Sequence, residues 1–247
     1  MKKIKLINLV AVIFTSSLLL SACGSSSNTV DEASEDTTTV DSNVTTDDSS
    51  VVSDDNSSVS QDTITSAKLS AAEIQGLLYM REEEELARDL YLDIYVATGS
   101  RLNVFKNISD NAETQHAEAM RVLLETYGLE DPSTGEHNTY TNTDLQALYD
   151  TLLNIAIGSD DLATLRVGAL VEETDIRDIL SDKAQVASEH KDIIDTYNNL
   201  LCGSRNHLRA FVKQIENKTG STYVTQVPEL DAEVQAILNS DQEKCGN

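Results

Sequence analysis

Apolar residues recur at intervals of three and four along most of the chain between residues 67 and 240, a spacing typical of amphipathic helices. The pattern predicts four long helices, over about residues 71–97, 109–127, 160–181 and 188–219. Ser109 is placed to cap the second helix, and Gly128 is placed to end it. No stretch of useful length alternates as a strand does, so residues 67–240 are predicted to form one all-α domain.

The connection between the second and third long helices is unusually long. Residues 129–143 are polar and contain Pro132, and a shorter helix then carries apolar residues on one side, namely Leu145, Leu148, Leu152 and Ala156. After the fourth helix we expect a short helix over residues 230–238 and a C-terminal tail over 241–247. The predicted architecture is a four-helix bundle whose crossover contains an extra short helix.

Ionisable residues interrupt the apolar faces of the first two helices. Glu84 lies in heptad register with Leu77 and Tyr91. Glu113 and His116 form an E-x-x-H step, which places both side chains on one face of the second helix. The acidic neighbours of Glu84, at positions 82, 83 and 85, are expected to be solvated.

The third and fourth helices repeat this feature. Glu172 lies in the apolar seam of the third helix, while Glu173 lies on the adjacent inner flank, and periodicity does not choose between them. His207 follows Leu200 by one heptad in the fourth helix. Gly203 weakens that helix, and either a close backbone approach or an open pocket would account for a glycine there.

A helical bundle that turns carboxylates and imidazoles inward must neutralise them, and two metal ions do so well. Oxygen and nitrogen ligands suit iron and manganese. The alternative is structural burial with hydrogen bonds. His137 and His190 fit no motif and are expected to be solvated, and Tyr91 is expected to be a core residue rather than a site residue. Arg88 and Arg209 are expected to pair either with ligand carboxylates or with surface acids.

Four segments together resemble the DUF2202 family of the ferritin-like superfamily over about residues 70–227. They are residues 82–89 (EEEELARD), 113–116 (ETQH), 167–176 (VGALVEETDI) and 203–211 (GSRNHLRAF). The resemblance implies a ferritin-like four-helix bundle with a glutamate on the first helix, E-x-x-H on the second, a glutamate on the third and E-x-x-H on the fourth.

This resemblance implies a set of metal ligands in the present chain. Glu84, Glu113, His116 and His207 match the first, second and fourth helices of the superfamily. For the third helix Glu173 is preferred, and Glu172 together with Asp175 is the alternative. Ser204 departs from the pattern, since a glutamate is expected at that position.

The function implied is a cell-envelope oxidoreductase with two iron ions, or alternatively manganese, acting on dioxygen or peroxide. The alternative is a non-catalytic module of the envelope that binds metal or a partner. Activity does not follow from the fold alone, and the sequence identifies no substrate, electron donor or protein partner.

The N-terminal residues predict export and anchoring. Residues 1–22 have a basic start, an apolar stretch and small residues before Cys23, as in a secretory signal. The stretch Leu20-Ser21-Ala22-Cys23 resembles a bacterial lipobox, which implies lipidation of Cys23 and attachment to an outer or other extracytoplasmic membrane face. Residues 23–66 are rich in Ser, Thr and Asp and predict a disordered tether.

Charge and cysteine content bear on nucleic-acid binding and on disulfide formation. The chain has 42 acidic and 18 basic residues and a formal charge of −24, so we expect no nucleic-acid partner. Beyond Cys23 there remain Cys202 and Cys245, in a compartment that permits disulfides, and the sequence leaves their pairing open.

Overall fold

A computed structural model describes residues 68–246 of the chain. The expected signal peptide, the tether and Cys23 lie outside the described residues. Within 68–246 the secondary structure is helical without any strand, so the predicted all-α fold is confirmed. None of the helices in this range is both long enough and apolar enough to cross a membrane.

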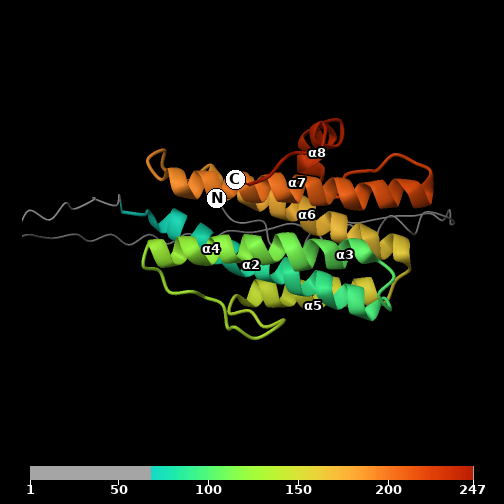
Figure 1. Cartoon of the computed structure of the whole chain (residues 1–247), viewed down its shortest axis with the longest axis horizontal. Helices are drawn as coiled ribbons and strands as arrows, with labels where there is room; N and C mark the ends of the chain where they lie inside the picture. Colours follow the sequence, from blue (N-terminus) through green and yellow to red (C-terminus); the bar gives the residue numbers. More distant parts are fainter. Residues whose placement is uncertain (1–67, 247) are drawn as a thin grey trace, which may run out of the picture. The chain divides into compact units, whose positions relative to one another are not determined.

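Four long helical rods form the bundle, and shorter helices lie around it (Figure 1). In chain order the elements are α2 (Ala71–Ala97), α3 (Asn103–Ile108), the π-helical turn η1 (Ser109–Glu113), α4 (Thr114–Thr126), α5 (Thr143–Ile157), α6 (Asp161–Lys183), α7 (Lys191–Thr219), the 3-10 turn η2 (Pro228–Leu230) and α8 (Asp231–Leu238).

The rod α2 packs against the rod α3–η1–α4, and α6 packs against α7. The crossover helix α5 lies against α2 and α6, outside the four-rod core, and α8 packs on α7 (Figure 1). Local sequence determines the helix ends: Ser70 and Glu73 form a reciprocal capping box, Asp160 caps α6, and Gly220 ends α7 with a φ of 66°. The bundle therefore has the predicted crossover helix.

The second rod differs from the sequence prediction. It begins at Asn103 rather than Ser109, because Val104, Phe105 and Ile108 are buried and extend its apolar face. Ser109 is not an N-cap: its hydroxyl donates to the carbonyl of Arg88 in α2 at 2.8 Å. The rod passes through the π-helical turn without interruption, and such turns often occur at functional sites.

The acidic run around Glu84 is also buried, contrary to the prediction that its neighbours are solvated. Glu82, Glu83 and Glu85 are each less than 9 % exposed. The backbone amide of Asn142, in the crossover segment, donates to Glu82 at 3.1 Å. Arg81 pairs with Glu85 at 2.9 Å. For Glu82, burial comes from the crossover segment, which periodicity within α2 does not reveal.

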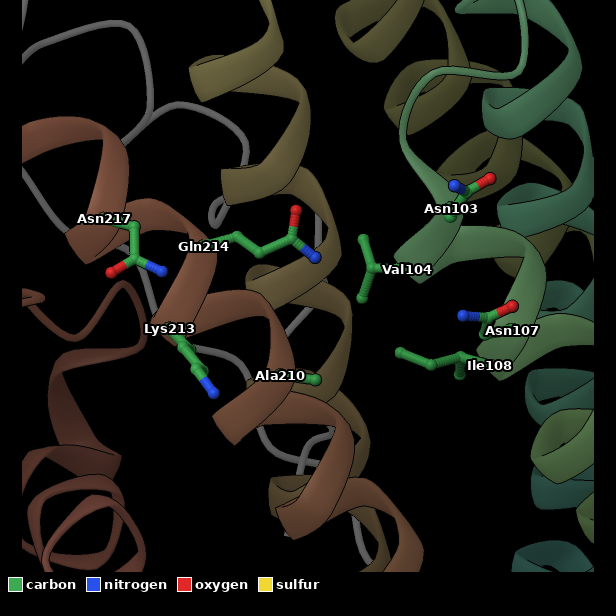
Figure 2. A pocket seen from close by; sticks show the side chains of 8 residues that line it. All are labelled: Asn103, Val104, Asn107, Ile108, Ala210, Lys213, Gln214 and Asn217. Atoms are coloured by element: carbon green, nitrogen blue, oxygen red, sulfur yellow. The ribbon is translucent and has the colours of Figure 1, made fainter.

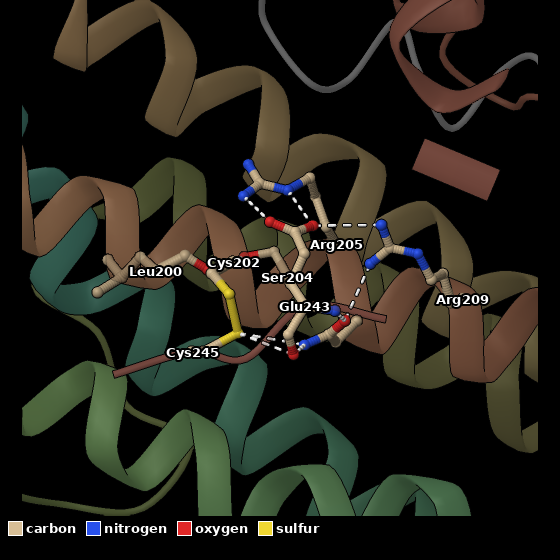
Figure 3. Close-up of a disulfide and its surroundings, with 8 residues drawn as sticks. Leu200, Cys202, Ser204, Arg205, Arg209, Glu243 and Cys245 are labelled. Atoms are coloured by element: carbon tan, nitrogen blue, oxygen red, sulfur yellow. Dashed lines mark hydrogen bonds and ion pairs between the residues drawn. A yellow bond between two sulfur atoms is a disulfide. The ribbon is translucent and has the colours of Figure 1, made fainter. Parts of the chain in front are cut away.

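The C-terminal tail is fastened to α7 (Figure 3). Cys202 and Cys245 form a disulfide, so the pairing that the sequence left open is present. Beside it, Glu243 accepts from Arg205 at 2.7 Å and pairs with Arg209 at 3.2 Å. Arg209 thus pairs with an acid of the tail and not with the inward carboxylates.

Candidate metal centre

Five of the six predicted ligand residues meet in the bundle interior. They come from all four rods: Glu84 from α2, Glu113 from η1, His116 from α4, Glu172 from α6 and His207 from α7. Two triads form, and in each triad ligand atoms of the three residues lie within 4.8 Å of one another. Glu113 belongs to both triads, one with Glu84 and His116 and the other with Glu172 and His207.

Glu113 lies between the two histidines. Its Oε2 is 3.1 Å from Nδ1 of His116, and its Oε1 is 2.9 Å from Nδ1 of His207. The outer carboxylates complete the triads, with Glu84 at 3.2 Å from His116 and Glu172 at 3.4 Å from His207. Each oxygen of Glu113 therefore faces a different triad, which is the arrangement of a carboxylate that bridges two cations.

One carboxylate oxygen of the centre is buried without a hydrogen-bond partner among the described residues. This atom is Oε1 of Glu84, whereas Nδ1 of His207 lies 2.9 Å from Oε1 of Glu113. Glu84 is 1 % exposed, and an unpaired buried polar atom is costly. Cations held between these atoms would satisfy them, so the side chains present fit a two-ion centre.

Without cations the centre holds protons. Burial raises the pKa of Glu84 to about 7, although His116 opposes the shift. Burial acts in the same direction on Glu113, but the charges of His207 and His116 outweigh it and hold its pKa far below the usual range. Burial lowers the pKa of His207, and Glu172 and Glu113 more than compensate, raising it to about 10. Metal ions would replace these protons.

Glu173 lies outside the centre, which corrects the preference for Glu173 over Glu172. Its carboxylate accepts from the hydroxyl of Tyr223 at 2.9 Å and from the backbone amides of Gln226 and Val227 at 2.9 and 2.7 Å. One residue is about 100° of rotation on a helix, and that step turns Glu173 toward the segment after α7. Its role in this structure is to hold that segment against α6.

Tyr91 has two roles, of which the sequence favoured only the core role. It is fully buried and packs its ring against Phe105 and Phe211, as a core residue does. Its hydroxyl also donates to Oε1 of Glu172 at 2.6 Å, which orients that carboxylate. Its position two turns after Glu84 was the available signal, because residues seven apart lie on the same face of a helix.

Gly203 allows His116 to enter the centre. A Cβ at position 203 would lie 2.4 Å from Nε2 and 2.5 Å from Cε1 of the His116 ring. The ring therefore packs directly on the backbone of α7. Of the two explanations that the sequence offered for this glycine, the structure shows the close backbone approach.

The remaining candidates lie elsewhere. His190 is buried, with its Nδ1 2.6 Å from Glu73, so the prediction that it is solvated was wrong: the start of α2 covers it. His137 is exposed and pairs with Asp93 at 3.0 Å. Arg88 pairs with neighbouring acids of α2, not with the inward carboxylates.

A groove of about 460 Å³ lies between α3 and α7 (Figure 2). Its lining residues are Asn103, Val104, Asn107, Ile108, Ala210, Lys213, Gln214 and Asn217. Ile108 precedes Glu113 by one π-helical turn, and Ala210 follows His207 by one α-helical turn. The side chains of His116 and His207 are 12 % and 10 % exposed, so the centre has limited contact with solvent.

Known proteins share this domain. The family described as an uncharacterised protein domain, DUF2202, matches residues 73–241. An uncharacterised protein of Methanocaldococcus jannaschii, MJ0754, is 38 % identical over 180 residues, covering 72 % of this chain and 93 % of that protein. The crystal structure of the hypothetical protein MJ0754 from Methanococcus jannaschii matches with a TM-score of 0.63 and 37 % identity, covering 71 % of this chain and 96 % of the other. The chain therefore belongs to the DUF2202 family.

Proposed function

We propose that this domain is a ferritin-like bundle that binds two transition-metal ions, iron or alternatively manganese. The observation that carries the proposal is the position of Glu113, whose two oxygens face two different histidine and carboxylate triads. Each triad offers one imidazole and two carboxylates, counting Glu113 in both, and this donor set favours iron and manganese. A purely structural cluster has no need of this near-symmetric arrangement.

The proposed activity is oxidoreduction with dioxygen or peroxide. Bound iron or manganese would supply the electron transfer for such a reaction. The residues of the chain would bind the ions, and Tyr91 would keep Glu172 oriented through its 2.6 Å hydrogen bond. The groove between α3 and α7 is large enough for a small molecule and lies one turn from two of the proposed ligands.

Metal analysis tests this proposal directly. The purified protein, loaded anaerobically with Fe²⁺ or Mn²⁺ and then desalted, should retain two ions per chain. His116→Ala and His207→Ala should each retain less, whereas His137→Ala serves as the control because that ring is exposed and belongs to neither triad. Less than about half an ion on the wild type would overturn the proposal.

Turnover distinguishes an enzyme from a module that only binds metal. If the centre is catalytic, the loaded wild-type protein should oxidise an added electron donor when peroxide is supplied. His207→Ala should lose that activity, because the second triad then lacks its imidazole. Full metal occupancy without any turnover would favour the non-catalytic module.

We further propose that Cys23 anchors the chain to an extracytoplasmic membrane face. The support is the lipobox-like stretch that ends at Cys23 and the basic and apolar residues before it. Mass spectrometry of the mature N-terminus should find a lipid-modified cysteine there. An unmodified Cys23, or cleavage at another residue, would refute this part of the proposal.

A further inference from the structure

Ser204 occupies the place on α7 where the ferritin-like pattern has a glutamate. It precedes His207 by three residues, so the two side chains lie on the same helix face. Ser204 is completely buried. Its hydroxyl donates to Oδ2 of Asp175 and lies 2.9 Å from the carbonyl of Leu200. The serine therefore directs its hydroxyl across to a carboxylate on α6.

Asp175 has one oxygen held and one oxygen unpartnered. It follows Glu172 by three residues, which places it on the same face of α6. The residue is 7 % exposed, and Oδ1 has no hydrogen-bond partner among residues 68–246. Burial raises the pKa of Asp175 well above its usual range, and the charges of Glu84, Glu172 and Glu113 add to that shift. The hydrogen bond from Ser204, together with the three-residue spacings to Glu172 and His207, places this carboxyl group on the helix faces that carry two of the proposed ligands.

We propose that Asp175 is a further carboxylate ligand of the two-ion centre, in the place of the missing glutamate at position 204, and that Ser204 is a positioning residue that orients it. This inference rests on the proposed metal-binding function. The geometry behind it is the Ser204 hydrogen bond, which holds Oδ2 and leaves Oδ1 as the donor atom available to a cation. The family resemblance offered Asp175 only as an alternative, together with Glu172, and did not connect it with the missing glutamate at position 204; that connection comes from the Ser204 hydrogen bond.

Charge balance supports the same assignment. Two divalent cations carry four positive charges, whereas Glu84, Glu113 and Glu172 carry three negative charges and the two imidazoles are neutral when they bind metal. A centre with these ligands alone would leave one net positive charge among buried side chains, which is unfavourable. Asp175 supplies the fourth negative charge and makes the buried centre neutral.

The test compares wild type with Asp175→Asn, Ser204→Ala and the double variant Asp175→Asn/Ser204→Glu. The control is Asp178→Asn, the same substitution one turn further along α6, where the carboxylate pairs with Arg177. Mn²⁺ titration is followed by elemental analysis for stoichiometry and by electron paramagnetic resonance for coupling between two ions. The unfolding midpoint is measured with and without Mn²⁺.

Asp175→Asn should weaken binding of the second Mn²⁺ ion by about tenfold or more, because losses of this order follow even from changes around metal ligands. It should also remove the electron paramagnetic resonance signal of two coupled ions. Ser204→Ala should weaken it less, since Asp175 remains. The double variant should recover two coupled ions, because the glutamate restores a carboxylate from α7. Asp178→Asn should behave as wild type.

The metal-free protein gives a second, independent readout. Asparagine has nearly the same shape as the aspartic acid and keeps an oxygen that accepts from the Ser204 hydroxyl, so metal-free Asp175→Asn should unfold at the same temperature as wild type or higher. A structural role would instead predict a lower midpoint for the metal-free variant. With Mn²⁺, the rise in midpoint should be smaller in the variant than in wild type.

The outcomes separate the two proposals. A wild type that binds no Mn²⁺ would overturn the metal-binding function and the role of Asp175 with it. A wild type that binds two coupled ions, with Asp175→Asn binding two coupled ions at unchanged affinity, would overturn the role of Asp175 alone. A lower metal-free midpoint with an unchanged metal-dependent rise would assign Asp175 to structure and also overturn its role.

Discussion

Replacing Gly203 by alanine should impair metal binding far more than it impairs folding. The added Cβ would lie 2.4 Å from Nε2 and 2.5 Å from Cε1 of His116, distances that carbon and nitrogen atoms do not tolerate. Position 203 belongs to the backbone of a long buried helix, so the His116 ring must move instead. Its Nδ1 would then leave Glu84 and Glu113, the two carboxylates of its triad.

The two effects on folding partly cancel. Alanine is favoured over glycine within a helix by about 1 kcal/mol. Overpacking a buried site costs about 1–3 kcal/mol. The unfolding free energy of the metal-free protein should therefore fall by no more than about 2 kcal/mol, a shift of a few degrees in midpoint for a domain of this size. The triad of His116, by contrast, loses its imidazole.

Elemental analysis after Mn²⁺ loading should find about one ion per chain in Gly203→Ala and two in wild type. The matched control is Gly76→Ala in α2, another mid-helix glycine, whose added Cβ would lie 3.0 Å from Asp182 and outside both triads. That control should keep both ions. Two ions bound to Gly203→Ala with wild-type affinity would show that the observed position of His116 is not needed for binding.

Three further predictions concern other parts of the domain. By elemental analysis, Glu172→Gln should lose one metal ion, whereas Glu173→Gln should keep both. By thermal unfolding, Glu173→Gln should have a lower midpoint, since it weakens the hydrogen bonds that hold residues 223–227. The reverse pattern would reinstate Glu173 as the ligand. The disulfide between Cys202 and Cys245 joins residues 43 positions apart. Replacing both by serine should lower the unfolding free energy in urea by about 2–4 kcal/mol, and an unchanged urea midpoint would contradict this. The pKa of His207 is about 10 in the folded metal-free protein, above its usual value of 6.5, so its stabilising contribution is complete below pH 6.5 and is lost as pH rises through about 10. Urea unfolding of the metal-free wild type from pH 6.5 to 10 should show this loss, and His207→Ala should show less of it.

Heptad spacing was sufficient to predict the four rods and most of the inward ionisable residues. Glu84, Glu113 and His116 occupy positions where a helix face is otherwise apolar, and side chains on such a face meet in the core of a bundle. His207 was found in the same way. The inward positions of these residues follow mainly from the periodicity of their own helices, which is a local property of the sequence.

The wrong predictions share one physical cause, which is burial by segments distant in sequence. Glu82 is buried because the crossover segment returns to cover α2, and Glu173 is buried because residues after α7 fold back on α6. His190 is covered by the start of α2. Periodicity describes which face of a helix is inward, but it carries no information on which loop will cover the other face.

Ser109 illustrates a different limit. Its side chain suits an N-cap, and local preference alone favoured a helix start there. In the structure the apolar residues before it continue the helix, and a π-helical turn carries the chain from Ser109 to Glu113. Packing against α2 thus overrides the local signal. The irregular turn ends at Glu113, three residues before His116, and both of these side chains point into the bundle.

Some of the buried acids differ in how their oxygens are satisfied. Glu73, Glu82 and Glu173 each accept backbone amide hydrogens from distant segments, so each fastens a loop to the bundle. Near the centre, by contrast, carboxylate oxygens without a hydrogen-bond partner belong to Glu83, Glu84 and Asp175. A folded chain seldom leaves buried oxygens unsatisfied. Cations bound as proposed would satisfy the free oxygens of Glu84 and Asp175, and both the proposed metal centre and its proposed additional ligand rest on this argument.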